Sequence, residues 1–162
     1  MNLERMTSDK KEIAKMSEIA TAIIRDYYNP IIGKEQNEYM IKMFQTEEAI
    51  LEQLEHGYNY YFVREDGRDL GFIAFYPREN ALYLSKFYLY KDERGKGFAK
   101  PILEFLKEKA KEFGYNRIEL NVNKNNDTRF IYEKLGFKIA WNEKNDIGNG
   151  FFMDDYVYAL DI

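Results

Sequence analysis

The hydrophobic period of this chain changes at Gly57, and that change limits the kinds of element it can form. Before Gly57, apolar residues recur every three or four positions, which is the period of an amphipathic helix. After Gly57, runs of aromatic and β-branched residues follow one another between turn residues, which is typical of strands. We therefore expect helices first and most of a sheet after them.

Three helices are predicted before Gly57. The first begins after Ser8 or Asp9, because either side chain can accept a hydrogen bond from a free N–H group of the first turn. Asn29-Pro30 and Gly33 are expected to interrupt the chain after this helix. The expected order is a short strand at residues 3–6, then helices at residues 13–27, 39–44 and 46–54.

The residues after Gly57 alternate strands with two helices. Asp66-Gly67 tolerates the positive φ of a tight turn, so residues 58–64 and 70–76 are predicted to pair as an antiparallel hairpin. Residues 81–90 are mostly apolar on both faces, as expected of a central strand. The remaining elements are a helix from Gly97, a strand at 117–122, a helix at 128–135, and strands at 137–141 and 151–160 around a polar loop.

This order predicts an α/β layered fold with a mixed, largely antiparallel central sheet of about six to seven strands flanked by helices. With 162 residues and 45% hydrophobic content, the chain has enough apolar side chains for one core without disulfides or a structural metal. We expect a single domain over residues 1–162.

Composition excludes several classes of site and partner. The absence of cysteine excludes disulfides, thiolate metal sites and a cysteine nucleophile, and His56 as the single histidine excludes a multi-histidine metal site. His56 is expected to be a helix C-terminal residue favoured by the helix dipole. The net charge of -4, without a block of Lys and Arg, argues against nucleic acid or an anionic membrane as partner. The charged N-terminus and the lack of a long apolar run predict a cytoplasmic protein.

Residues 88–100 combine the end of a strand, a glycine-containing turn and the start of a helix. Helix N-termini offer unpaired N–H groups, and Gly95 and Gly97 let a pyrophosphate approach the backbone, so this turn can hold a nucleotide diphosphate. The alternative is a tight strand-to-helix connection that happens to use glycines. The spacing matches neither G-x-x-x-x-G-K-[ST] nor a G-x-G-x-x-G after the first strand.

A second motif covers residues 125–137, Asn-Asn-Asp-Thr-Arg-Phe-Ile-Tyr-Glu-Lys-Leu-Gly-Phe. On its own it is equally typical of an amphipathic helix that ends at Gly136, with Tyr132 packed as an ordinary aromatic residue. The two motifs in this order, with a strand between them, are more specific than either motif alone.

Together the two motifs resemble the GNAT superfamily of N-acetyltransferases, over residues 58–160. Residues 94–99 match the family's R/Q-x-x-G-x-G/A coenzyme A motif, and Asn125 and Tyr132 stand at the spacing of its N-x-x-A…Y-E-K-x-G-F segment. The helical N-terminal third is similar to small GNAT enzymes that include polyamine acetyltransferases. The resemblance implies the GNAT acyl-CoA acyltransferase fold with splayed central strands.

The resemblance also implies acetyl-CoA as acyl donor and assigns residues to it. Tyr132 would place its hydroxyl near the thioester sulfur; a phenol with a reference pKa of about 10 stays protonated at neutral pH and can donate to the departing thiolate as general acid. Asn125 would help to hold the cofactor arm. Backbone groups of the central strand would bind the pantetheine amides. The implied pantetheine residues are Phe87, Tyr88 and Leu89, and the implied diphosphate residues are Arg94, Gly95, Lys96, Gly97, Phe98, Ala99 and Lys100.

The chain departs from the family pattern in three places. Ala99 replaces the commoner glycine, and Thr128 and Arg129 stand where Ala and an aliphatic residue are usual. The strand at 82–90 carries no Asp or Glu, so the general base is unassigned. The candidates are Asp154 and Asp155 in the last strand and Glu35 and Glu38 in the N-terminal helices; a solvated surface acid is the plainer interpretation of each.

The leading hypothesis is transfer of an acetyl group from acetyl-CoA to an amine by direct attack in a ternary complex, since no cysteine is available for a covalent intermediate. The acceptor stays open among small-molecule amines, polyamines included, and peptide amino groups. A catalytically silent GNAT-fold module that binds acyl-CoA or a protein is the alternative, and a nucleic-acid-binding α/β domain is a third hypothesis that the acidic balance opposes. The sequence does not fix the oligomeric state; a homodimer is one option.

Overall fold

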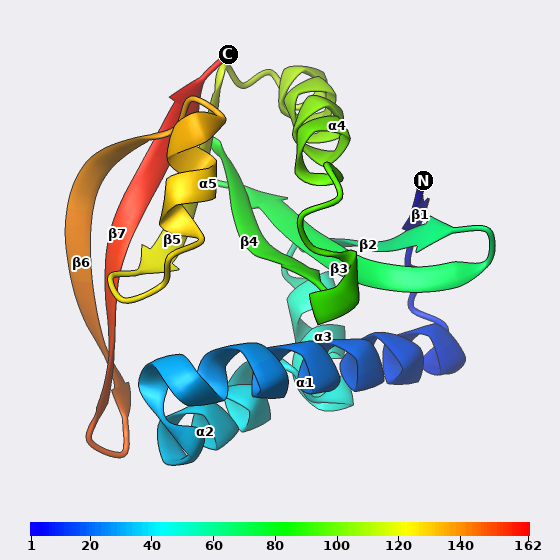
Figure 1. Cartoon of the computed structure of the whole chain (residues 1–162). Helices are drawn as coiled ribbons and strands as arrows, with labels where there is room; N and C mark the ends of the chain where they lie inside the picture. The colour runs from blue at the N-terminus through cyan, green and yellow to red at the C-terminus, as the bar shows by residue number, and fades with distance from the viewer. The chain divides into compact units, whose positions relative to one another are not determined.

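A computed structural model describes every residue of the chain, and its backbone divides into two compact units. The first unit comprises Met1–Tyr76 and Lys86–Phe98, and the second comprises Pro77–Ser85 and Ala99–Ile162. Each unit is described by itself below, with the elements labelled as in Figure 1. The single domain expected over residues 1–162 stays a prediction.

Seven strands form a mixed sheet in the order β1-β2-β3-β4-β5-β7-β6, so β4 is the central strand, as predicted. β4 pairs with β5 in parallel, whereas β1 with β2, β2 with β3, β5 with β7, and β6 with β7 pair in antiparallel fashion. The predicted mixed, largely antiparallel sheet flanked by helices is therefore confirmed. The strands are β1 (Asn2–Arg5), β2 (Asn59–Glu65), β3 (Arg68–Pro77), β4 (Leu82–Leu89), β5 (Arg117–Asn123), β6 (Lys138–Gly148) and β7 (Phe151–Asp161).

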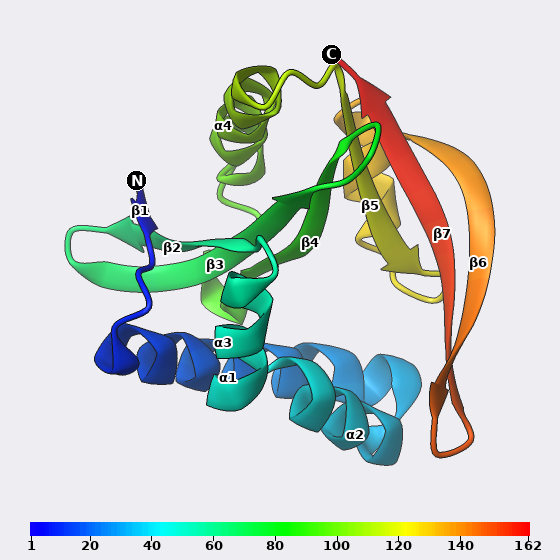
Figure 2. The same cartoon turned by 180° about the vertical axis from the view of Figure 1, so that it is seen from behind.

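Three helices of the first unit gather on one side of β2 and β3 (Figures 1 and 2), namely α1 (Lys10–Ile32), α2 (Lys34–Phe44) and α3 (Glu47–Glu55). The side chain of Asp9 accepts from the N–H group of Lys11 at the start of α1, and that of Thr46 accepts from Ala49 at the start of α3. The predicted cap at Asp9 is thus confirmed, and α3 begins where the sequence indicates. His56 ends α3, with Nδ1 2.8 Å from the carbonyl oxygen of Glu52, as expected of a helix C-terminal residue.

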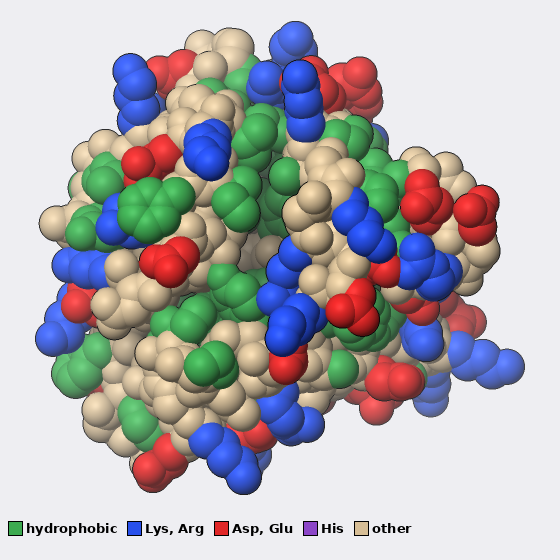
Figure 3. All heavy atoms as spheres, in the orientation of Figure 1, with side chains coloured by type: hydrophobic (Ala, Val, Ile, Leu, Met, Phe, Trp, Pro, Cys, Tyr) green, Lys and Arg blue, Asp and Glu red, His purple; other side chains and the backbone are tan.

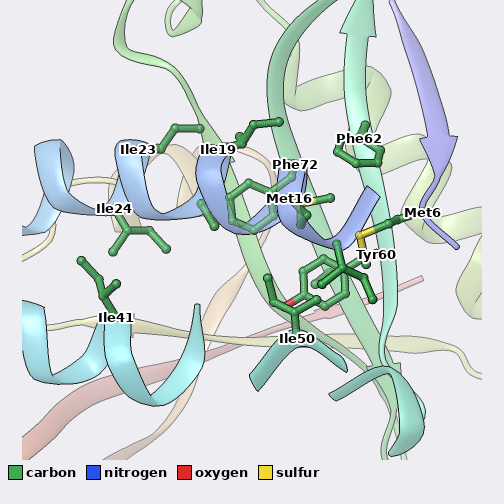
Figure 4. Packing of buried hydrophobic residues seen from close by; sticks show 13 residues of the cluster. Met6, Met16, Ile19, Ile23, Ile24, Ile41, Ile50, Tyr60, Phe62 and Phe72 are labelled. Atoms are coloured by element: carbon green, nitrogen blue, oxygen red, sulfur yellow. The ribbon is translucent and has the colours of Figure 1, made fainter. Parts of the chain in front are cut away.

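The core of the first unit lies between these helices and the two strands. In Figure 4, Ile50 of α3 lies beside Tyr60 of β2, and Ile24 of α1 and Ile41 of α2 point toward one another. Full burial of one such side chain contributes about 1.5–3 kcal/mol relative to exposure. The hydrophobic period before Gly57 therefore marks the face that each helix turns toward the strands.

The expected chain break at Asn29-Pro30 is wrong, because α1 continues through Pro30 to Ile32. Proline removes one N–H group and so costs one hydrogen bond within the helix. Pro30 stands in the last turn of α1, and the helix ends two residues later at Ile32. The N–H group of Gly33, which has φ +87°, still donates to the carbonyl of Asn29, so the helix closes past the proline.

The second unit combines β5, β6 and β7 with the first part of β4 and with α4 (Ala99–Glu112) and α5 (Arg129–Lys134). Alternate residues of β5 are buried, Ile118, Leu120 and Val122 among them, which confirms the strand predicted there. α5 ends before Gly136, whose φ of +102° matches the expected helix C-terminus. The hydroxyl of Tyr158 in β7 donates to Glu133, which fixes α5 to the sheet face that also carries Leu120.

The polar loop between the last two strands is much shorter than predicted. β6 continues through polar residues to Gly148, and Gly148 pairs with Phe151 at the start of β7. The turn is reduced to Asn149 and Gly150, with φ of +53° and +78°, the signature of a two-residue hairpin turn. β6 is an exposed edge strand, so it needs no apolar period and its polar residues mask it in the sequence.

The surface mixes both signs of charge. On the face displayed in Figure 3, Lys and Arg side chains are interspersed with Asp and Glu side chains. None of the helices combines the length and the apolar content that a bilayer crossing requires.

One charged side chain is buried at the centre of the first unit. Lys86 of β4 is 6% exposed, and its Nζ lies 2.8 Å from the carbonyl oxygen of Phe44, 3.0 Å from Gln45 Oε1, 3.0 Å from Gln53 Oε1 and 2.5 Å from the Tyr60 hydroxyl. Phe44 is the last residue of α2, so the ammonium caps the negative end of that helix from a distant strand. Three N–H groups are thus shared among four neutral oxygens. Burial lowers the pKa of Lys86 to about 7.

Replacing Lys86 with methionine is expected to change the pH dependence of stability. Because the pKa is about 7 in the fold against 10.5 for an ordinary lysine, the unfolded chain holds more protons between these values, and wild-type stability relative to Lys86→Met rises with pH there. The expected gain is about 2 kcal/mol between pH 7 and pH 9. Urea unfolding at both pH values measures it, with Lys42→Met, an exposed lysine of α2, as control. A pH-independent difference would show that Lys86 keeps an ordinary proton affinity.

Candidate active site

The second half of β4 carries the three residues expected to contact pantetheine, Phe87, Tyr88 and Leu89. All three are half-buried members of the first unit. The Tyr88 ring lies between Tyr28 of α1 and Phe72 of β3, with centroids at 6.0 Å and 5.6 Å. The registered pairs between β4 and β5 are Leu82 with Ile118 and Tyr83 with Glu119, at the start of β4. The implied splay at 87–89 stays a prediction.

Gly71 sets the path of this part of β4, and the sequence analysis did not single it out. A Cβ atom at Gly71 would fall well inside van der Waals contact of the Tyr88 carbonyl oxygen and 2.8 Å from Leu89 Cα. Just beyond, the N–H group of Tyr90 donates to the carbonyl of Leu70 at 2.9 Å. A glycine inside a strand is a signal of such close backbone approach. Gly71 is therefore needed for the position of the backbone at Tyr88 and Leu89.

The glycine turn follows β4 through the short 3₁₀ helix η1 (Lys91–Glu93). Gly95 and Gly97 have φ of +75° and +83°, a region that side chains other than glycine adopt only with strain. The N–H group of Arg94 donates to Lys91, but those of Gly95, Lys96, Gly97 and Phe98 have no hydrogen-bond partner. Both glycines and Lys96 are exposed. The turn thus presents unused N–H groups to solvent, the property that phosphate binding needs.

The charged side chains of the turn are held by the protein itself. Arg94 Nε donates to the carbonyl of Leu89 at 3.1 Å, and its guanidinium lies over the Tyr27 ring at 4.6 Å from the centroid. Lys96 Nζ lies 3.3 Å from buried Glu93, which also pairs with Arg68. The hydrogen bond from Arg68 holds the pKa of Glu93 below its ordinary value. Glu93 is therefore a buried anion that fixes Lys96 and the start of the turn.

Ala99 and Lys100 open α4, in the second unit. The first N–H groups of a helix have no partner within the helix, and its dipole makes this end positive. Pro101 stands in the first turn, where its missing N–H group costs no hydrogen bond, as expected. The predicted diphosphate residues 94–100 are thus one continuous strand-to-helix connection.

Asn125 and Tyr132 both lie in the second unit, after β5. Asn125 is exposed, and its N–H group donates to Asn123 Oδ1. Its neighbour Asn126 is buried and accepts from the Thr128 N–H group, so Asn126 rather than Asn125 shapes the turn into α5. Tyr132 is half-buried, with its ring edge-to-face against Phe137 at 5.6 Å. Its part as general acid stays a prediction.

The four candidate bases differ sharply in environment. Glu35 is exposed, Glu38 forms a two-point ion pair with Arg25, and Asp154 is 46% exposed and pairs with Lys124 at 3.0 Å. For these three the interpretation as surface acids fits. For Asp155 it is wrong, because this residue is 3% exposed. Burial raises the pKa of the Asp155 carboxyl, the amide of Asn121 lowers it, and the nearby charge of Glu143 raises it again.

Asp155 belongs to a polar network on the sheet face opposite to Leu120 and Tyr158. Asn121 Nδ2 lies 3.2 Å from Asp155 Oδ2 and 3.1 Å from Glu143 Oε2, while Asn121 Oδ1 accepts from the Tyr83 hydroxyl at 2.8 Å. Trp141 Nε1 donates to Glu143 Oε1 at 2.9 Å, and this bond first of all keeps the pKa of Glu143 below its ordinary value. Asn121, Glu143 and Tyr83 were not among the predicted site residues; polar residues at alternate positions of a buried strand were the available signal.

The comparisons with known proteins agree with this arrangement. The family match shows that the seven-stranded mixed sheet with its flanking helices is an α/β protein of the acyltransferase type. The family described as "Acetyltransferase (GNAT) domain" matches residues 28–156, and the chain belongs to this family. The family resemblance drawn from the two motifs is thereby confirmed.

Two relatives from Bacillus subtilis (strain 168) match parts of the chain. The uncharacterized N-acetyltransferase YdgE is 33% identical over 91 residues, which cover 51% of this chain and 57% of YdgE. The uncharacterized N-acetyltransferase YycN is 38% identical over 64 residues, which cover 39% of this chain and 40% of YycN. The chain thus matches about half of the length of these relatives.

Solved structures share the fold over nearly the whole chain. The PaiA N-acetyltransferase from Thermoplasma acidophilum, in complex with coenzyme A, has a TM-score of 0.78 at 22% identity, with 100% of both chains covered. A GCN5-related N-acetyltransferase from Rhodopseudomonas palustris has a TM-score of 0.81 at 16% identity, covering 99% of this chain and 95% of that chain. At these identities the likeness establishes the GNAT fold.

Gly71→Ala is expected to displace β4, because the added methyl group overlaps the backbone at Tyr88 and Leu89. Overpacking of this kind costs about 1–3 kcal/mol of stability. Urea unfolding measures that loss, and faster amide hydrogen exchange at Tyr90 reports the displaced strand. The control is Gly67→Ala, where an added Cβ meets no atom within 4 Å and only the φ of +74° is strained. Unchanged exchange at Tyr90 in Gly71→Ala would contradict the role of Gly71.

Proposed function

We propose that this chain transfers an acetyl group from acetyl-CoA to a primary amine. The observation that carries the proposal is the set of unpaired N–H groups at residues 95–98, in a turn whose Gly95, Lys96 and Gly97 are exposed, directly before the N-terminus of α4 in a member of the GNAT family. The coenzyme A that is bound to the PaiA N-acetyltransferase structure supports a similar ligand here.

In this proposal the diphosphate is bound by backbone dipoles. The N–H groups of the glycine turn and the first turn of α4, from Gly95 to Lys100, would surround the phosphate oxygens. Arg94 would act indirectly, since its guanidinium already binds the Leu89 carbonyl and so fixes where the turn leaves β4. The pantetheine arm would follow the backbone of Phe87, Tyr88 and Leu89, and Asn125 would hold it further along.

The chemical step proposed is direct attack by the amine on the thioester carbonyl. No cysteine is available to carry the acetyl group, so donor and acceptor would be bound together. Tyr132 is the proposed general acid for the thiolate that leaves. The acceptor is proposed to be a small amine, with polyamines among the candidates, or a peptide amino group. The chain is further proposed to act in the cytoplasm and as a homodimer.

Gly97→Ala is expected to weaken acetyl-CoA binding about tenfold, because a Cβ at a φ of +83° distorts the turn that carries the N–H groups. Isothermal calorimetry with acetyl-CoA measures the affinity. Gly114→Ala is a matched control, since Gly114 has the same φ but stands at the C-terminal end of α4. Wild-type protein that binds no acetyl-CoA near millimolar concentration would refute the proposed donor.

Tyr132→Phe is expected to lower kcat about 100-fold with a panel of primary amines while leaving acetyl-CoA affinity unchanged, because only the proton donor is removed. Thiol release measures turnover, and Tyr156→Phe in β7 serves as the control. Full activity of Tyr132→Phe on every amine would refute the acid role. Wild-type protein that binds acetyl-CoA but releases no thiol with any amine would instead support a catalytically silent acyl-CoA-binding module.

A further inference from the structure

We propose that Asp155 is the base that takes the proton from the acceptor ammonium, and that Asn121 and Glu143 position it for this step. The inference rests on the proposed function and adds to it the residue that the sequence left unassigned. It is carried by the geometry of one polar network, whose members come from β4, β5, β6 and β7 and all belong to the second unit.

The Asp155 carboxylate is buried and poorly satisfied. Its Oδ2 accepts one hydrogen bond, from Asn121 at 3.2 Å, and its Oδ1 has no hydrogen-bond partner. A buried carboxylate normally has several donors or a cation, because desolvation of an ionised carboxyl is costly. Oδ1 is thus an acceptor atom that an ammonium group can satisfy.

Three hydrogen bonds hold the Asn121 amide in place beside Asp155. Its amide oxygen is fixed by the hydroxyl of Tyr83, which sets the direction of the amide nitrogen toward the two carboxylates. Those two N–H bonds go to Asp155 Oδ2 and Glu143 Oε2. The amide therefore holds one carboxylate oxygen of Asp155, Oδ2, and leaves Oδ1 without a donor.

Glu143 differs from Asp155 although the two are direct partners across β6 and β7. Glu143 accepts from Trp141, Asn121 and Asn145, so its ionised form is well satisfied. Glu143 is a fixed negative charge beside Asp155. A neighbouring charge of the same sign raises the proton affinity of a carboxylate that has fewer hydrogen-bond donors. Glu143 is therefore a positioning residue that makes Asp155 a stronger base.

The other charges around Asp155 do not neutralise it. Asp154, next to it in β7, is a second negative charge, and Lys124 after β5 is the cation that acts on Asp155. Lys124 already pairs with Asp154 at 3.0 Å. Arg78, from the turn before β4, lies over the Tyr83 ring and acts on Glu143. No cation of this unit forms an ion pair with Asp155, which leaves that place for a substrate ammonium.

The acceptor nitrogen loses two protons in the reaction, one before and one after it attacks. Asp155 and Tyr132 of α5 belong to opposite faces of the sheet, so the ammonium gives one proton to Asp155 through bound water. The free amine then attacks the thioester carbonyl to form a C–N bond. Collapse of the tetrahedral intermediate breaks the C–S bond, and the thiolate takes the Tyr132 proton to leave as coenzyme A. The nitrogen then loses a second proton, which restores Tyr132, and Asp155 releases its proton to solvent. The net products are an amide, free coenzyme A and one proton.

Asp155→Asn tests the catalytic role with the amine that the wild-type protein acetylates fastest. At pH 7 kcat/KM is expected to fall about 100-fold or more, with acetyl-CoA affinity unchanged, and the deficit should shrink toward pH 10 because the amine then loses its proton without help. Asp161→Asn, at the end of β7 with a carboxylate that is 84% exposed and outside this network, should keep wild-type kinetics. A deficit that stays constant with pH, or none within threefold, overturns the role of Asp155.

A second readout is independent of turnover. The pKa of the Asp155 carboxyl, followed by ¹³C NMR in the protein without ligand, should lie above the ordinary value and should fall in Glu143→Gln. The acid limb of the wild-type pH profile of kcat/KM should move to lower pH in the same variant. An ordinary pKa that Glu143→Gln leaves unchanged overturns the inference even if the protein is an active acetyltransferase. A perturbed pKa in a protein that acetylates no amine overturns the proposed function and the catalytic role with it.

Discussion

Four segments of the first unit meet at the ammonium of Lys86. Its hydrogen bonds connect β4 to the end of α2, to Gln45 directly after α2, to α3 and to β2. Apolar packing is not directional, so on its own it would not fix how these segments meet. Hydrogen bonds from one ammonium group to several oxygens at fixed positions define one arrangement. The next residues along the strand are Phe87, Tyr88 and Leu89, so the same side chain that fixes α2 and α3 also fixes the start of the proposed pantetheine segment. Gly71 supplies the second constraint on this segment by letting the β4 backbone come close to β3.

The two proposed ends of the reaction use different physical means. The glycine turn presents backbone N–H groups whose direction is set by φ values that only glycine adopts freely. The Asp155 network instead uses side chains on one sheet face, held in register by strand pairing and by an amide with three hydrogen bonds. The first arrangement is encoded locally by a short motif. The second depends on residues that are far apart along the chain.

That difference explains how much the sequence could predict. The helices of the first unit, the hairpin at Asp66-Gly67 and the central position of β4 followed from period and turn chemistry, and the family followed from two motifs with fixed spacing. Pro30 misled because its effect depends on how many helical residues follow it, and β6 was hidden because an exposed edge strand needs no apolar residues. The burial of Asp155 could not be predicted, since it depends on the pairing of β7 with both β5 and β6. Gly71 left a visible signal, a glycine inside a strand, but its partner could be known only from the structure.

Glu93 orders the charged side chains around the glycine turn, which is the proposed diphosphate site. Its buried carboxylate holds Lys96 and Arg68, and Arg94 is turned inward to Leu89 and Tyr27, so the protein fixes the positions of these three cations. Attraction between mobile surface charges weakens quickly as counterions accumulate, whereas contact with fixed amide dipoles at short range is screened far less. A ligand recognised here would therefore meet donors whose positions are already fixed, so the shape of its phosphate groups would contribute to recognition as well as its total charge.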